Sequence, residues 1–359
     1  MSPAPQRGGQ PPAPAEEDWA ALVAALRAAP SPVLVAHVAP DGDALGSALG
    51  VALALRSLGS APRVTFGETP ALTPRALRFL PGQELIVDPG SVEAAPEVIV
   101  AFDTSSAARL GELADRFTAS PASFAVDHHA SYTGFASTGL VDVAAPATAV
   151  LALELVDRLG AELTAEVATC LYTGLTTDTG SFRYAGTTPA THAVAARLLA
   201  TGIRHDEIAR AVWDTTPFGY LPVLGAALSR AVLEPAAAGG LGLVWTCVPA
   251  ADRAAHGVEL DTVEGVVDVV RRAEEAEVAC VLKQEDPGPG GEPGRWRVSL
   301  RSKGAVDVSR AAVALGGGGH RYAAGFEAAG EPAVIVRAVL DRLASSTSED
   351  VAPTAEGVA

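Results

Sequence analysis

Short apolar runs alternate with longer segments of helical periodicity from Trp19 onward. Continuous apolar runs of this length are typical of strands buried on both faces, whereas the longer segments are typical of helices. Strands are predicted at 33–38, 63–66, 98–102 and 123–126, and helices at 20–29, 44–58, 147–159 and 165–175. This alternation predicts an α/β domain in which a mainly parallel sheet is covered by helices on both faces.

The pattern changes between residues 215 and 238, where Pro217, Pro222 and Pro235 interrupt the chain. We place the domain boundary here, with a first domain at 18–216, a linker that contains a helix at 217–236, and a smaller α+β domain at 237–344. In the second domain, strands are predicted at 241–248, 278–283 and 296–301, and helices at 309–315 and 333–343. The composition of residues 1–17 and 345–359 predicts disordered tails.

Acidic residues outnumber basic ones by 42 to 26 among the 359 residues, which gives a net charge of −16. Long duplex nucleic acid is therefore an unfavourable partner, because its binding depends on Lys and Arg neutralising phosphates. Cys170, Cys247 and Cys280 are far apart, so reduced thiols in a cytoplasmic protein are expected rather than a disulfide framework or a zinc–thiolate site. No apolar run reaches the ~18 residues of a membrane span.

Four segments place carboxylate or imidazole side chains directly after apolar strands or at a helix end. They contain, in order, His37-x3-Asp41-x-Asp43, Asp103, Asp127-His128-His129 and Asp178. The carboxyl ends of parallel strands line one edge of a sheet, so the first three segments are expected to meet in one crevice. A single Asp after a strand is most often a helix cap or a turn residue. The arrival of several such segments in register with the βα pattern favours a functional site.

So many carboxylates cannot all ionise in one pocket without a counter-charge. Oxygen ligands with a few imidazoles and no thiolate favour Mn, Mg or a related ion over a structural zinc. The number of groups suits two ions, an arrangement that is widely used to hydrolyse phosphoesters. The residues themselves therefore predict a metal-dependent phosphoesterase.

These segments resemble the DHH phosphoesterase superfamily over about residues 18–344. Asp127-His128-His129 matches its name-giving motif, His37-x3-Asp41-x-Asp43 its first motif, and Asp103 and Asp178 its second and fourth motifs. The resemblance implies two Mn ions, with Mg or Co also compatible. It implies that one ion is held by His37, Asp41 and Asp103, and the other by Asp43, Asp103, His128 and Asp178.

The same resemblance implies roles for residues around the metals. Asp127 would orient the ligands, as carboxylates often do. His129 would face the substrate phosphate and assist the leaving group. Arg109 is a candidate phosphate contact, although a solvated helix residue explains it equally well.

Basic residues concentrate in the segment from Arg295 to Arg321, which carries a local charge of +5 because Asp307 is its only acid. Such a concentration predicts an anion site, and the run Gly316-Gly317-Gly318-Gly319-His320 predicts a binding loop whose N–H groups can face a phosphate. The segment is similar to the DHH-associated C-terminal domain. That similarity implies substrate binding in a cleft between the domains, through Arg301, Ser302, Gly317, Gly318, Gly319 and His320.

The combination most resembles the branch of the superfamily that degrades nanoRNA and dephosphorylates 3′-phosphoadenosine-5′-phosphate. It implies cleavage of RNA of about two to five nucleotides, which agrees with the few phosphates that one basic segment can neutralise. Two alternatives remain open: a phosphodiesterase of cyclic dinucleotides, and a non-catalytic nucleotide-binding regulator. No membrane partner is expected, and a homodimer is compatible with the sequence.

Overall fold

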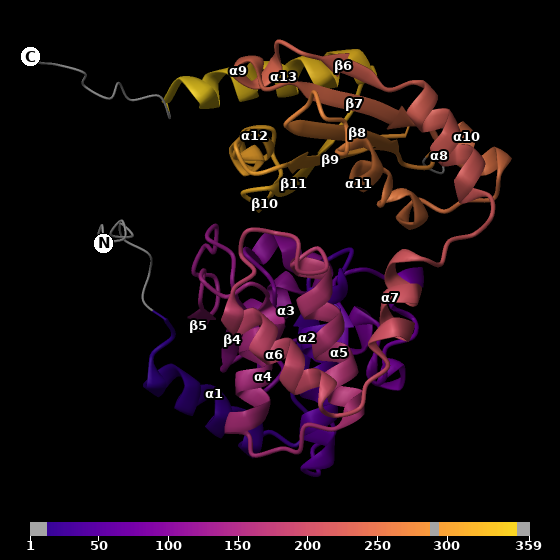
Figure 1. Ribbon diagram of the computed structural model, residues 1–359. Coiled ribbons are helices and arrows are strands. Elements are labelled where there is room, and N and C mark those ends of the chain that lie inside the picture. The colour runs from indigo at the N-terminus through magenta and orange to yellow at the C-terminus, as the bar shows by residue number, and fades with distance from the viewer. Residues whose placement is uncertain (1–12, 288–293, 350–359) are drawn as a thin grey trace, which may run out of the picture. The chain divides into compact units, whose positions relative to one another are not determined.

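The structure is a computed structural model that describes residues 13–287 and 294–349. The chain divides into two compact units, Met1–Thr215 and Thr216–Ala359 (Figure 1). Within the described residues, no helix is both long and apolar enough to cross a membrane.

The first unit is built on a five-stranded sheet with the order β2-β1-β3-β4-β5, in which every neighbouring pair is parallel. This confirms the predicted parallel sheet. The strands are β1 (Val33–Ala36), β2 (Arg63–Phe66), β3 (Ile99–Phe102), β4 (Ser123–Asp127) and β5 (Thr138–Val141). β5 was not predicted from the sequence, because its four residues include Thr138 and Gly139 and are mostly half-buried, so they form no apolar run.

Helices cover both faces of this sheet. Side chains of successive strand residues point to opposite faces, so each face has its own hydrophobic core. Leu34 and Val100 contribute to a large core with the longer helices, whereas Val33 and Ile99 pack with Phe117 in a smaller core on the opposite face. The α-helices are α1 (Glu16–Ala28), α2 (Gly42–Ser57), α3 (Ala114–Ala119), α4 (Thr148–Arg158), α5 (Ala165–Asp178), α6 (Pro189–Leu199) and α7 (His205–Trp213). Short 3₁₀ turns are η1 (Arg75–Leu77), η2 (Gln83–Leu85), η3 (Pro89–Ser91) and η4 (Ala107–Leu113).

The second unit contains a six-stranded sheet with the order β10-β11-β9-β8-β7-β6, in which only β7 and β8 are parallel. Its strands are β6 (Val232–Glu234), β7 (Leu243–Val248), β8 (Val278–Gln284), β9 (Trp296–Ser302), β10 (Gly318–His320) and β11 (Ala323–Ala328). Its helices are α8 (Tyr220–Ser229), α9 (Ala237–Gly240), α10 (Ala250–Ala255), η5 (Asp261–Val263), α11 (Val266–Val270), α12 (Val308–Ala314) and α13 (Pro332–Glu349). The mixed sheet with its helices confirms the predicted α+β class.

Three segments differ from the boundaries predicted above. α8 lies in the predicted linker 217–236, yet Tyr220, Val223 and Ala227 are buried in a core of the second unit because they share one helix face. α1 begins at Glu16, inside the predicted N-terminal tail, where acidic residues in its first turn suit the helix dipole. α13 continues to Glu349, past the predicted end of order at Ala344. Residues 1–12 and 350–359 lie outside the described part of the chain.

Glycines allow α2 and α5 to pack closely, and this packing brings together the residues at the ends of both helices. A Cβ atom built on Gly46 of α2 would collide with the backbone carbonyl of Cys170 in α5. A Cβ on Gly174 of α5 would lie 2.8 Å from an oxygen of Asp43. The short distance between the helices therefore depends on the absence of side chains at these positions.

We expect Gly46→Ala to lower the free energy of unfolding by about 1–3 kcal/mol, because a backbone carbonyl cannot move aside as a flexible side chain can. Gly90→Ala is a matched control in the same unit, since a Cβ there would meet nothing within 4 Å. Chemical denaturation of both variants measures the difference. Equal stability of the two variants would contradict the proposed close packing.

Candidate metal centre

The carboxyl edge of the first sheet carries three of the predicted segments. His37 follows β1, Asp103 follows β3, and Asp127 ends β4 with His128 directly after it. All four side chains are buried. Asp103 has a φ of +54°, a left-handed conformation that non-glycine residues rarely adopt and that is found preferentially at functional sites.

Two helices supply the remaining carboxylates. Asp41 caps the N-terminus of α2, where its side chain accepts hydrogen bonds from the backbone N–H groups of Asp43 and Ala44. Asp43 lies in the first turn of α2, and Asp178 is the last residue of α5. Because α2 and α5 pack against one another, these carboxylates converge on the same edge of the sheet.

The predicted ligands fall into two groups that could each hold a metal ion. The first group is His37, Asp41 and Asp103, and the second is Asp43, His128 and Asp178. Within each group, the candidate ligand atoms all lie within 4.8 Å of one another. We call these six residues the metal cluster.

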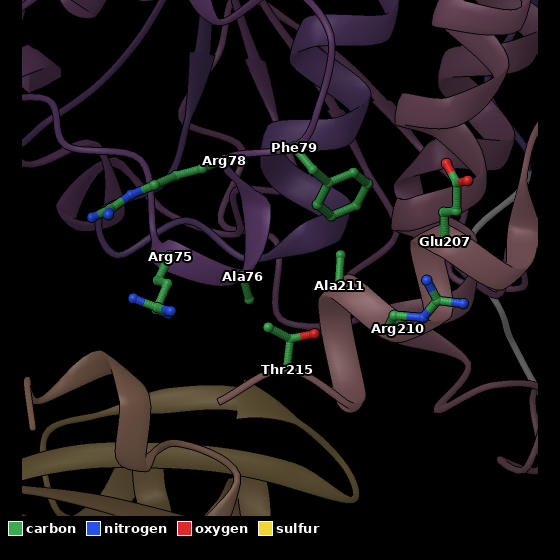
Figure 2. Close-up of a pocket in the computed structure, with 8 residues that line it drawn as sticks. All are labelled: Arg75, Ala76, Arg78, Phe79, Glu207, Arg210, Ala211 and Thr215. Carbon is green, nitrogen blue, oxygen red and sulfur yellow. The ribbon is translucent and has the colours of Figure 1, made fainter. Parts of the chain in front are cut away.

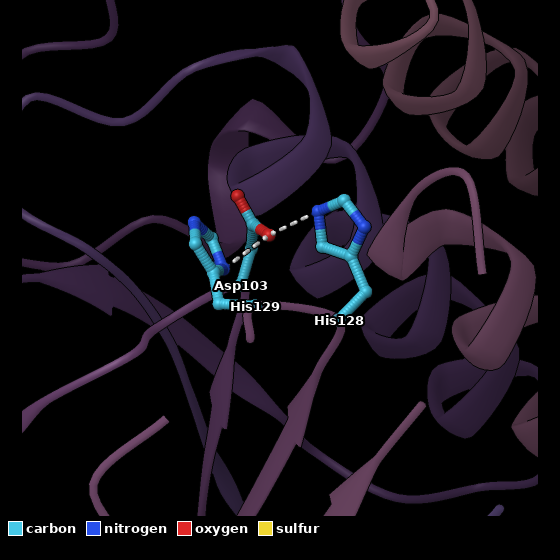
Figure 3. A group of neighbouring side chains, drawn as sticks. All are labelled: Asp103, His128 and His129. Carbon is cyan, nitrogen blue, oxygen red and sulfur yellow. Dashed lines mark ion pairs between the residues drawn. The ribbon is translucent and has the colours of Figure 1, made fainter. Parts of the chain in front are cut away.

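Asp103 connects the two groups of the metal cluster. Nε2 of His37 lies 3.7 Å from Oδ2 of Asp103, and Nε2 of His128 lies 3.4 Å from Oδ1 of the same residue. His128 is also 3.3 Å from Asp178 and 3.9 Å from Asp43. Figure 3 shows His128 and His129 both directed at the Asp103 carboxylate. Asp103 is therefore placed to contribute a ligand atom beside each group.

Hydrogen bonds on the far side of two imidazoles prepare them as metal ligands. Nδ1 of His37 lies 2.8 Å from the carbonyl oxygen of Val38, and Nδ1 of His128 lies 3.0 Å from that of Ala145. A carbonyl oxygen only accepts, so Nδ1 carries the hydrogen in each ring. In the neutral imidazole, Nε2 then presents its lone pair to the carboxylate side, which is the usual arrangement in metal-ligating histidines.

His129 is held differently. Its Nδ1 lies 2.7 Å from Oδ1 of Asp127, so the buried aspartate orients the ring and leaves Nε2 as its second polar atom. Oδ2 of Asp127 is also buried and accepts no hydrogen bond among the described residues. This contact is with His129 and not with a residue of the metal cluster, so the predicted role of Asp127 in orienting the metal ligands stays a prediction.

The N-terminus of α4 contributes three donors that the sequence analysis missed. The backbone N–H groups of Thr148 and Ala149 donate to the two oxygens of Asp43, at 2.6 Å and 2.8 Å. The hydroxyl of Thr148 donates to Oδ1 of Asp103 at 2.9 Å. A Thr at the start of a helix is ordinarily interpreted as a helix cap. Its position at the beginning of the predicted helix was the one feature of the sequence that could have indicated this contact.

The charges of the cluster shift its pKa values in opposite directions. Burial, followed by repulsion from Asp103 and Asp178, raises the pKa of Asp43 well above its usual range. Burial, with added repulsion from Asp103, raises the pKa of Asp178 to about 7. Burial also acts to raise the pKa of Asp103, but the neighbouring imidazoles outweigh it and hold that pKa well below its usual value.

These pKa shifts arise because the site holds more carboxylates than neighbouring positive charges. The excess negative charge must be balanced by protons or by a cation. A divalent ion would supply the positive charge without protonating the carboxylates. Carboxylate oxygens with a few imidazoles and no thiolate fit Mn or a similar hard ion. The residues present therefore fit a divalent metal centre.

The predicted substrate contacts differ in their exposure and in their hydrogen bonds. Arg109 has an exposed side chain in η4, and its backbone carbonyl accepts a hydrogen bond from the N–H of Val38. The hydroxyl of Ser302 is buried, donates to Glu277, and accepts from the N–H groups of Gly304 and Val306. These contacts show that the hydroxyl of Ser302 stabilises the turn after β9.

The predicted glycine loop is largely a strand. Gly318–His320 form β10, an edge strand that is antiparallel to β11. Gly317 lies so close to β11 that a Cβ would collide with Gly325 and Phe326, and Gly319 has a φ of +132°. Packing and backbone conformation thus explain these two glycines. The side chain of His320 lies outside the described residues.

The local charge of the basic segment is smaller than its sequence suggests. Arg297 lies 2.8 Å from Glu285, and Arg295 lies 3.8 Å from Glu327. Both acids lie outside the segment in sequence and were not counted in the estimate of +5. Arg301 is half-buried in β9, where its guanidinium donates to the backbone carbonyl of Leu300.

Comparison with known families identifies both units. Residues 32–175 match the DHH family, N-terminal domain, and residues 246–345 match the DHHA1 domain. The chain is 37% identical to the bifunctional oligoribonuclease and PAP phosphatase NrnA of Thermus thermophilus over 304 residues, which are 84% of this chain and 85% of the relative. It is 25% identical to the probable bifunctional oligoribonuclease and PAP phosphatase NrnA of Streptococcus mutans, over 85% of this chain and 91% of the relative.

A solved structure supports the same architecture. The crystal structure of an exopolyphosphatase-related protein from Bacteroides fragilis superposes with a TM-score of 0.80 at 25% identity. The alignment covers 93% of this chain and 98% of the other.

We expect Thr148→Val to weaken divalent metal binding by about 10- to 100-fold, as loss of a partner that orients a ligand usually does. The variant keeps the shape and the backbone donors but removes the hydroxyl that holds Asp103. Titration calorimetry with Mn measures the effect, and thermal unfolding with chelator present verifies the fold. Thr148→Ser retains the hydroxyl and should bind Mn normally. Wild-type Mn affinity in Thr148→Val would contradict this role.

Proposed function

Because the chain belongs to the DHH family of phosphoric ester hydrolases, we propose that it hydrolyses short oligoribonucleotides to 5′-mononucleotides, and 3′-phosphoadenosine-5′-phosphate to AMP. The observation that carries this proposal is the metal cluster at the carboxyl edge of the first sheet. Its support is the similarity to relatives whose names state these two activities.

The proposed cofactor is a pair of Mn ions. His37, Asp41 and Asp103 would hold one ion, and Asp43, Asp103, His128 and Asp178 the other. When bound, such ions supply positive charge to phosphoryl oxygens and lower the pKa of water. The fixed donors of α4 keep Asp43 and Asp103 in place for this purpose.

His129 and Asp127 are the proposed catalytic residues beside the metals. Asp127 accepts the hydrogen of Nδ1, which fixes the ring of His129 and leaves Nε2 to contact the substrate. When the ring carries a hydrogen on both nitrogens, Nε2 would donate to a phosphoryl oxygen or deliver its proton to the leaving oxygen. A bonded pair of this kind orders the ring before the substrate arrives, which lowers the cost of reaching the productive geometry.

The proposed preference for short substrates follows from charge. A chain with a net charge of −16 repels a long polyanion, and extended strands need many phosphate contacts to overcome this. Arg109 on the first unit, and Arg301, His320 and Gly318 on the second, are the proposed contacts for the few phosphates of a short substrate. Ser302, Gly317 and Gly319 are left out of this set because internal packing and backbone conformation account for them.

We expect Mn-loaded protein to release mononucleotides from RNA of about two to five nucleotides and to leave a 24-mer nearly untouched at physiological salt, because few phosphates can be neutralised. One kinetic panel should compare dinucleotide, pentamer and 24-mer RNA with 3′-phosphoadenosine-5′-phosphate and cyclic di-AMP. Processive digestion of the 24-mer would refute the length rule. Faster cleavage of cyclic di-AMP than of dinucleotide RNA would replace the proposed substrate.

Asp103→Asn tests the pair of ions directly. We expect turnover to fall by about a thousandfold or more, since the charge stabilisation at stake is several kcal/mol. The total Mn content per chain, measured after dialysis by elemental analysis, should fall below that of wild type. Glu112→Gln, a change of the same kind at an exposed carboxylate of the first unit, is the control. Near-normal turnover in Asp103→Asn would exclude a bridging role.

Arg301→Ala should separate recognition from chemistry. Loss of a charge-assisted contact should reduce kcat/KM for dinucleotide RNA by about 10- to 100-fold. Hydrolysis of bis-p-nitrophenyl phosphate, which has no nucleotide to be held, should change much less. Arg295→Ala removes the same charge at a residue already paired with Glu327 and is the matched control. Equal losses on both substrates would show that Arg301 serves the chemical step itself.

A further inference from the structure

Two groups of cations outside the metal cluster differ in their geometry. Between η1 and α7, Arg78 and Arg210 are among the residues that line a pocket of about 380 Å³, but Figure 2 shows their guanidinium groups directed away from each other. In the second unit, Lys283 of β8 and Arg297 and Arg301 of β9 lie on one face of the sheet. Charges that share one face act together on a ligand, so the second group is the better candidate for binding an anion.

The strand register places these three cations together. Lys283 pairs directly with Arg297, and Arg301 lies two residues further along β9. Successive side chains alternate between the faces of a sheet, so all three cations lie on the face opposite to the buried side chains of Val298 and Leu300. Like charges opposite one another on neighbouring strands are unfavourable, so nearby acids are needed to offset them.

Acids offset two of the three cations. Glu285 lies 2.8 Å from Arg297, and Glu264 forms an ion pair with Lys283. Within the described part of the chain, Arg301 forms no ion pair, and its guanidinium donates to a backbone carbonyl. This face is therefore left with one cation whose charge is not offset, and it is the residue that the proposed function assigns to a substrate phosphate.

Lys283 differs from the two arginines because its side chain is only 2% exposed. Its ammonium donates to Glu264 and, at 2.8 Å, to the hydroxyl of Ser299, which lies between Arg297 and Arg301 on β9. Burial lowers the pKa of Lys283, Glu264 opposes this, and repulsion from Arg301 and Arg297 adds to it. A buried ammonium needs a partner of opposite charge, and this chain supplies Glu264.

The position of Glu264 indicates what Lys283 prevents. The carboxylate of Glu264 is 50% exposed, directly after η5. Although burial opposes it, the pKa of Arg297 is raised by Glu285 and, more weakly, by Glu264. The carboxylate of Glu264 is therefore within electrostatic reach of β9. Without the ammonium of Lys283, it would compete with a phosphate for the guanidinium of Arg301.

We propose that Lys283 is a positioning residue for the substrate, because it holds the carboxylate of Glu264 and so keeps the guanidinium of Arg301 available to a substrate phosphate. A carboxylate and a phosphate present similar paired oxygens to an arginine, so a released carboxylate beside Arg301 is a direct competitor. Lys283 is buried and acts through Arg301 rather than by touching the substrate. The inference rests on the proposed function, from which it takes the assignment of Arg301 to a nucleotide phosphate.

Binding of the dinucleotide pApA in the presence of chelator tests this role without turnover at the metal cluster. Lys283→Met should weaken the affinity measured by calorimetry about tenfold, because the released carboxylate of Glu264 pairs with Arg301. Lys283→Met combined with Glu264→Gln should restore the affinity, since no carboxylate is then left to compete. A merely structural role of Lys283 predicts no such rescue. With Mn present, the loss should appear in KM for dinucleotide RNA, with kcat and the hydrolysis of bis-p-nitrophenyl phosphate little changed.

Control variants separate this role from a general effect of charge. Arg337→Met removes a positive charge from an exposed position of α13, which packs on the other face of the sheet, and should change nothing. In the Arg301→Ala background, Lys283→Met should cause little further loss, because effects that act through one contact are not additive. Lys283→Gln, which keeps a donor for Ser299, serves if thermal unfolding shows that the Met variant is unstable.

The outcomes distinguish this inference from the proposed function. Wild-type affinity in Lys283→Met, failure of Glu264→Gln to restore binding, or absence of pApA binding to the wild-type chain would overturn the inference. Binding of pApA without release of mononucleotide when Mn is present would instead refute the proposed function, and the role of Lys283 in binding would stand.

Discussion

Mutual repulsion among carboxylates at one buried sheet edge is the constraint on which the site depends. Removing these groups from water makes each charge more costly, and their proximity adds to that cost. The chain offsets part of it with fixed donors: two N–H groups of α4 on Asp43, and a hydroxyl on Asp103. The N-terminus of α4 also brings the positive end of its helix dipole to the cluster. These donors fix the positions of the two carboxylates, but the remaining negative charge must still be balanced by protons or by a cation.

Close helix packing is the means by which these carboxylates meet. Asp43 and Asp178 come from different helices, so they share one pocket only because α2 and α5 approach one another without intervening side chains. Gly174 faces Asp43 directly, and a methyl group there would press on the carboxylate. The left-handed backbone of Asp103 is a further local cost, of about 1–3 kcal/mol, that the surrounding structure must sustain. The fold therefore holds its ligands in place before any ion binds.

The sequence predicted the parallel sheet and the convergence of the segments at one edge because both follow from local patterns, whereas the grouping of the ligands was implied by the family resemblance. Strand and helix periodicities differ, and residues after parallel strands share an edge, so the convergence of His37 and Asp103 could be inferred without a structure. Thr148 could not, because its contact with Asp103 joins positions far apart in sequence. A helix was expected where α8 lies, but its packing in the second unit was missed because the prolines around it indicated a linker. The strand β10 was missed because glycine carries no apolar signal.

The basic segment of the second unit shows why charge counted along a sequence overstates an anion site. Glu285, directly after β8, and Glu327, in β11, pair with two of its arginines, and a count over one segment does not include them. What remains for a substrate is a small number of cations rather than a track. Each phosphate that a protein neutralises adds to affinity, so a site with few such contacts binds few phosphates well. Under the proposed function, the same pairing that reduces the local charge would favour a short substrate over a long one.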